Sequence, residues 1–236
     1  MRADVHRLVQ EAQALLSPDG ETDPATLERT FTLRFHDAVT AAIGPGLLAA
    51  VRAQAPGVRL RFLAEAGAET SDLRHGRVDA EIGAAEPALP EIRGEVLGHD
   101  ALAVAVPPGW RGRSLPARRY AAAEHVIVSR RGRLRDPVDD ALEAAGLRRR
   151  TVAAAPATDA ALALAAATGA VVTLPARIAA PAVARHGMRL LPLPVAAPPV
   201  PVILCWHQRF DTDRAHAWLR GLLRERVAAA LALPEG

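Results

Sequence analysis

The sequence contains no lysine, one cysteine and few aromatic residues. All 29 basic residues of the 236 are arginine, and the formal net charge is only +3. A charge so close to balance gives no argument for direct nucleic-acid binding through a broad basic surface. The single thiol, Cys205, excludes an internal disulfide and is typical of a reducing compartment.

Long uninterrupted apolar runs are also missing, so we expect no membrane-spanning segment. Residues 1–16 carry acids and glutamines where a secretory signal needs an apolar core, so we expect a cytoplasmic protein. Half of the residues are hydrophobic but only 3% are aromatic. The chain is therefore long enough for a sizeable core, which small aliphatic side chains must fill.

Common catalytic and cofactor motifs do not occur. There is no GxSxG elbow, no Walker loop and no dinucleotide-binding glycine pattern. The eight histidines form no HxxxH or HxH pair, so we expect no metal site. Cys205 lies in an apolar run and is predicted to be a core residue, not a nucleophile. We therefore expect no cofactor and no enzymatic activity.

Strand and helix patterns alternate along most of the chain. An amphipathic helix over residues 4–16 and a polar linker to residue 30 come first. A βαβαβ series follows, in which Asp37 is expected to cap a helix that Pro45 kinks or restarts. The predicted strands are 31–35, 58–63, 78–83, 92–97, 101–106, 125–129, 151–155, 170–174, 190–193 and 202–206. The predicted helices beyond residue 30 are 37–54, 70–75, 136–145, 158–168, 176–185 and a last one that Thr212 caps. Alternation of this kind implies parallel pairing and right-handed crossovers.

Two strand-to-helix turns in the first part of the chain are candidate ligand contacts. His36 and Asp37 follow the first strand, and Glu65, Ala66 and Gly67 follow the second. Ligands of open α/β sheets bind at such strand ends, where helix N–H groups point outward. The alternative for the first turn is a capped helix with an exposed histidine, and for the second an ordinary turn.

The second α/β series offers a basic turn, Ser129-Arg130-Arg131-Gly132-Arg133, between a strand and a helix. Hydroxyl, guanidinium and amide donors there could hold an anion, or the turn is simply a solvated basic loop. A basic face interleaved with aromatics, as single-strand nucleic-acid binders need, is not found.

Several stretches in a fixed order resemble the effector-binding region of LysR-type transcriptional regulators. The first are Phe31–Leu48 with His36-Asp37 and Pro45, then the Ala55-Pro56-Gly57-Val58 turn. LRHGRVDAEIG from Leu73, DPVDDALEAAGL from Asp136 and TLP ending at Pro175 follow, and HGMRLLPLP and WHQRFDTDRAHAWLR close the series. Each piece is unspecific alone, but together they span residues 31 to 226.

The resemblance implies two Rossmann-like subdomains joined by two crossover strands, as in type II periplasmic-binding proteins, plus a short N-terminal helix. Subdomain I is expected over 31–104 and 206–236, and subdomain II over 105–205. Residues 1–30 would be the remnant of a linker helix and linker, since no winged helix-turn-helix is recognisable in this chain. Departures from the family pattern are a shortened helix after the second strand, His36 in place of serine or threonine, and Thr158 in place of a bulky aromatic.

The resemblance also implies a function, which is sensing of a small organic effector, best an anion, in the cleft between subdomains. The expected contacts are His36, Asp37, Glu65, Ala66, Gly67, Ser129, Arg130, Thr158 and Thr173. The partners would be a second copy of the chain in a homodimer or homotetramer, and promoter DNA only through the missing N-terminal domain. The alternative on the same fold is a solute-binding protein of a transport system.

Overall fold

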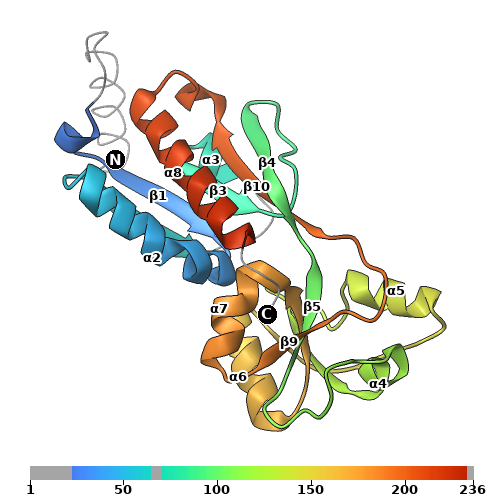
Figure 1. Cartoon of the computed structure of the whole chain (residues 1–236). Coiled ribbons are helices and arrows are strands. Elements are labelled where there is room, and N and C mark those ends of the chain that lie inside the picture. The colour runs from blue at the N-terminus through green and yellow to red at the C-terminus, as the bar shows by residue number, and fades with distance from the viewer. Residues whose placement is uncertain (1–22, 65–70, 233–236) are drawn as a thin grey trace.

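The computed structural model describes residues 23–64 and 71–232 and has two α/β halves joined by two chain segments (Figure 1). The two Rossmann-like subdomains expected from the sequence are confirmed. The helix expected over residues 4–16 lies outside the described residues. Within those residues, no helix is both long and apolar enough to cross a bilayer.

The first half is built on a five-stranded sheet in the order β2-β1-β3-β10-β4. Its strands are β1 (Thr30–Phe35), β2 (Arg59–Ala64), β3 (Ala80–Gly83), β4 (Ile92–Asp100) and β10 (Val200–His207). Its helices are α2 (Asp37–Gln54), α3 (Ser71–Arg74) and α8 (Arg214–Leu231), with 3₁₀ turns η1 (Pro24–Thr26) and η2 (Gln208–Phe210). β1 is parallel to β2 and β3, as predicted, whereas β10 is antiparallel to β3 and β4. The antiparallel pairing follows because β10 returns from the other half without a crossover helix.

The second half is built on two groups of strands that one bridge joins. Its strands are β5 (Leu102–Val106), β6 (Glu124–Val128), β7 (Arg150–Ala155), β8 (Val172–Pro175) and β9 (Arg189–Pro192). Its helices are α4 (Ala117–Ala122), α5 (Pro137–Ala144), α6 (Thr158–Thr168) and α7 (Ala176–Arg185). The sheet β8-β5-β9 and the pair β6-β7 meet at a parallel bridge between His125 and Val171, which gives the order β7-β6-β8-β5-β9. The pattern did not predict α4, which lies in an arginine-rich stretch.

The start of α2 differs from the expectation. His36, not Asp37, is the N-cap, and its Nδ1 accepts a hydrogen bond from the backbone N–H of Ala38 at 3.3 Å. Asp37 is the first residue of α2, and its carboxylate contacts the start of α6 and does not cap α2. Pro45 does not restart the helix, because one missing N–H removes only one ladder bond and the apolar face continues on both sides. At the other end of the chain, Asp213 and not Thr212 caps α8.

Separate cores stabilise the halves. In the first, α2 and α8 contact each other and pack against the same face of β1, and fully buried residues include Phe31, Leu33, Leu47, Val51, Leu219, Leu223 and Val227. In the second, α6 and α7 cover one face of the sheet, while α4 and α5 cover the other (Figure 1). Each buried side chain of this size contributes roughly 1.5–3 kcal/mol of transfer free energy. The helices α6 and α7 lie on the side of the second half that meets α2.

Candidate functional site

The strand ends of the two halves meet where α2 and α6 begin. Asp37, the first residue of α2, accepts a hydrogen bond through Oδ2 from the backbone N–H of Asp159 at 3.1 Å. Asp159 is the second residue of α6, which follows β7. The structure therefore brings three of the predicted site residues together: His36, Asp37 and Thr158.

The surroundings of Asp37 favour its ionised form. Burial by itself would raise the pKa of Asp37. Hydrogen bonds from His36 and from the backbone N–H groups of Thr158 and Asp159 outweigh burial, so the pKa lies well below its ordinary value. The carboxylate is therefore charged throughout the neutral range. Its side chain is 34% exposed and that of His36 is 27% exposed, so solvent reaches both.

Nδ1 of His36 lies between a hydrogen-bond donor, the backbone N–H of Ala38, and a hydrogen-bond acceptor, the carboxylate of Asp37. Nδ1 accepts from Ala38 N–H at 3.3 Å and lies 3.0 Å from Oδ1 of Asp37. An unprotonated Nδ1 can accept from the amide, whereas an N–H at this position would donate to the carboxylate. The same imidazole nitrogen therefore contacts both the first capped amide of α2 and the carboxylate of Asp37.

Ser129 and Arg130 follow the end of β6, beside the end of β7. The backbone N–H of Ser129 donates to the carbonyl of Ala155 at 2.7 Å. The hydroxyl oxygen of Ser129 accepts from the backbone N–H of Arg133 at 2.9 Å, so the turn is closed on itself. This turn shares a sheet edge with the segment that leads to Thr158, as the predicted site requires. Glu65, Ala66 and Gly67 lie outside the described residues.

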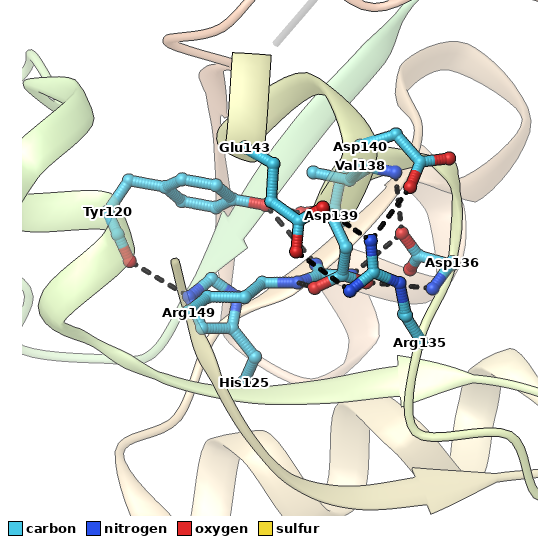
Figure 2. A network of polar contacts seen from close by, with 10 residues as sticks. Tyr120, His125, Arg135, Asp136, Val138, Asp139, Asp140, Glu143 and Arg149 are labelled. Atoms are coloured by element: carbon cyan, nitrogen blue, oxygen red, sulfur yellow. Dashed lines mark hydrogen bonds and ion pairs between the residues drawn. The ribbon is translucent and has the colours of Figure 1, made fainter. Parts of the chain in front are cut away.

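Thr173 contacts a different set of residues. Its hydroxyl lies 2.7 Å from the hydroxyl of Tyr120 on α4, which accepts from Arg149 at 3.4 Å. Figure 2 shows Tyr120 and Arg149 beside the start of α5, where Arg149 pairs with Asp136 and Asp139. Both side chains of the Tyr120–Arg149 pair are buried. Burial raises the pKa of the Tyr120 hydroxyl, so it stays protonated.

The predicted anion-binding role of helix N-termini meets a constraint. Side chains already cap five of these termini: His36 at α2, Asp136 at α5, Asp37 at α6, Asp100 at α7 and Asp213 at α8. An anionic ligand at any of these ends must therefore compete with a protein group. Hydroxyl and guanidinium donors, such as those of Ser129, Arg130 and Thr158, carry more of the expected recognition than backbone amides do.

Sequence reasoning missed Asp100, Tyr120, Arg149 and Asp159. Asp100 is fully buried, and a charged residue just before an apolar strand is a signal that could have marked it. Asp159 follows Thr158 at a predicted helix start. Tyr120 and Arg149 come together only through tertiary packing. Within residues 23–64 and 71–232, no group of three histidine, cysteine or acidic side chains could hold a metal ion.

Comparisons with known proteins agree with the fold. The family model "LysR substrate binding domain" matches residues 24–228. The HTH-type transcriptional activator NagR of Ralstonia sp is 27% identical over 225 residues, covering 92% of this chain and 73% of NagR. The solved probable transcriptional regulator PA0477 of Pseudomonas aeruginosa has a TM-score of 0.79 at 28% identity, covering 94% of this chain and 74% of that one. The regulatory domain of MexT, a transcriptional activator of the same organism, has a TM-score of 0.76 at 25% identity, covering 86% of this chain and 100% of that one.

These relatives are regulators, so the alternative of a transport solute-binding protein is wrong. The order of motifs, the two-lobed fold and the comparisons point to one assignment. The chain belongs to the LysR substrate-binding domain family and is the effector-sensing domain of a LysR-type transcriptional regulator.

Proposed function

We propose that the effector of this domain is a small organic anion bound between its two halves. The observation that carries the proposal is the hydrogen bond from Asp159 N–H to Asp37, which brings the strand ends of both halves to one place. Open α/β sheets bind ligands at such strand ends. The contacts we propose are His36, Asp37, Ser129, Arg130, Thr158 and Thr173, with Glu65, Ala66 and Gly67, which follow β2 in the sequence.

An anion is the best match because the donors of this set outnumber its acceptors. Ser129 and Thr158 each offer a hydroxyl proton, and Arg130 offers a planar guanidinium that suits a carboxylate. The set also contains two carboxylates, Asp37 and Glu65, and Asp37 already has a partner in Asp159 N–H.

The effector would act by a shift of population. A ligand that binds one arrangement of the halves better than another favours that arrangement by the difference in binding free energy. In the whole regulator, which we propose to be a cytoplasmic homodimer or homotetramer, this shift would reorient DNA-binding domains N-terminal to this one. Promoter DNA would be contacted only through those domains, and no catalytic step is involved.

A thermal-shift screen of small acids tests the proposal. Acetate, benzoate and succinate, each beside its amide analogue, should separate charge from shape. A ligand at a hundred times its Kd stabilises the fold by about 2.7 kcal/mol, and this shift should be lost in His36→Ala and Arg130→Ala. Arg135→Ala is the matched control, because Arg135 is an arginine outside the proposed contact set whose guanidinium pairs with Asp140 and Glu143. An acid that raises the melting temperature of His36→Ala and of Arg130→Ala as much as that of the parent chain would overturn the site.

A further inference from the structure

Two helices of the second half share an unusual start. The N-cap positions of α6 and α7 are Ala157 and Pro175, whose side chains have no acceptor to offer the first amides of the helix. Both helices receive a carboxylate from the first half instead. Asp37 of α2 caps α6, and Asp100 of β4 caps α7.

The Asp100 contact is the deeper of the two. Asp100 is 0% exposed, and its carboxylate accepts from the backbone N–H groups of Arg177 at 3.0 Å and Ile178 at 2.8 Å. It is the last residue of β4, where the chain passes into the second half, and the next residue, Ala101, accepts from Ala176 N–H at 2.8 Å. The side chain of Ile178 is buried in the core of the first half. Polar and apolar contacts thus fix the start of α7 to the first half.

The Asp37 contact is shallower, and it joins two helices, α2 and α6, that are not part of the crossing segments. A single oxygen accepts from Asp159 N–H at 3.1 Å, and about a third of the side chain is exposed to solvent. The buried residues of α6, among them Ala161, Leu162 and Ala165, belong to the core of the second half. The start of α6 is therefore joined to the first half by a contact that water can replace.

We propose that Asp37 is a releasable latch between the two halves and that Asp100 is the fixed pivot about which they turn. A rotation about the crossing segments keeps contacts on the axis and separates contacts at the rim. Asp100 lies on one crossing segment, so its bonds to Arg177 and Ile178 survive the rotation. Asp37 is on α2, which is neither of the crossing segments, so its bond to Asp159 must break before the halves separate.

The latch goes beyond the proposed function, because it operates without an effector. It sets the population of the closed arrangement in the ligand-free domain, and any ligand then adds to or subtracts from that population. His36 takes part as a positioning residue, since its Nδ1 lies 3.0 Å from the Asp37 oxygen that Asp159 does not use.

Amide hydrogen exchange of the 236-residue chain, measured by NMR without ligand, tests the latch residue by residue. Amides in the first turn of a helix exchange quickly unless a cap protects them. Asp37→Ala should raise the exchange rate of the Asp159 amide at least tenfold and leave the Ile178 amide unchanged. Asp37→Asn keeps a side-chain oxygen and should give an intermediate rate. Asp140→Ala, on the exposed side of α5, is the control and should change neither amide.

A second measurement, the distance between spin labels on the two halves, reports their separation. Spin labels on Leu48→Cys of α2 and Leu164→Cys of α6 use exposed positions on the two helices that the latch joins. Asp37→Ala should broaden the label-to-label distance distribution toward longer distances, while Asp140→Ala should leave it unchanged. The latch is refuted if Asp37→Ala changes neither the Asp159 exchange rate nor the distances, or if Asp159 and Ile178 exchange faster together. Should Asp37→Ala fail to fold, Asp37→Asn decides by the same two measurements. Because neither needs an effector, a failed acid screen would refute the proposed ligand class and leave this result standing.

Discussion

The guanidinium of Arg149 donates two parallel hydrogen bonds to the carboxylate of Asp139, from Nε at 3.0 Å and from Nη2 at 2.8 Å. Nη2 also lies 2.7 Å from Oδ1 of Asp136, and the Arg149 side chain is 0% exposed. A buried cation is stabilising only while its partners remain, and removal of one partner leaves buried charge uncompensated. The triad therefore ties the residue directly before β7 to the start of α5 (Figure 2).

Arg149→Met should lower the free energy of unfolding by about 3 kcal/mol, because Asp136 and Asp139 lose their counter-charge. For a chain of this size the melting temperature should fall by roughly 10 °C. Differential scanning calorimetry measures the change. Arg135→Ala is the control on the same helix start, and its exposed contacts should be worth little.

Further variants of the same triad separate the stability lost through uncompensated charge from the stability lost through a change of side-chain shape. Adding Asp136→Asn and Asp139→Asn to Arg149→Met removes the uncompensated charge, while the amide oxygens can still cap α5. This triple variant should recover part of the lost stability. If it is less stable than Arg149→Met alone, the carboxylates are not the source of the loss.

Mild acid should destabilise the fold through two buried histidines. Burial lowers the pKa of His125 and of His216 to about 4, and both rings are 0% exposed. The unfolded chain takes up protons near pH 6.5, so stability is full above that pH and falls as the pH drops toward 4. At pH 5 each histidine should cost roughly 2 kcal/mol. Urea unfolding at pH 7, 6 and 5 measures this slope.

Protonation of Asp79 has the opposite effect on stability in acid. Burial raises its pKa, so the folded chain holds this proton more tightly than the unfolded chain and gains some stability in acid. The fall of stability in acid is therefore shallower than the two histidines alone would give. His125→Gln should flatten it further, whereas a slope that is unchanged in both His125→Gln and His216→Gln would contradict this account.

Sequence patterns predicted most elements because burial alternates with the period of each element. The limits of α6 and α7 agree with the structure to the residue, since apolar spacing and the flanking glycine and proline mark both ends. The caps of α2 and α8 were misplaced by one residue each, because neighbouring polar residues, His36-Asp37 and Thr212-Asp213, can serve equally in sequence. The contact partners of Asp37 and Asp100 could not be predicted, since both lie more than seventy residues away along the chain.

Asp100 should be among the most sensitive single positions in the described chain. Asp100→Ala leaves the first amides of α7 buried without an acceptor, which should cost about 2 kcal/mol. Asp100→Asn retains one acceptor oxygen and should lose less. Equilibrium urea unfolding at pH 7 compares the two, and equal stability of Asp100→Ala and the parent chain would contradict the capping role.

The Cys205 thiol should be almost inert in the native chain. The residue is 4% exposed within β10, and burial, with the nearby charge of Glu81, raises its pKa to about 12. At pH 8 only about one thiol in ten thousand is then ionised, and the thiolate is the reactive form. Labelling with a disulfide reagent at pH 8 should be at least a thousandfold slower in buffer than in strong urea, where the thiol is accessible and its pKa is normal. Cys205→Ser should not react in either condition, and rapid labelling of the native chain would show that β10 opens far more often than its buried position implies.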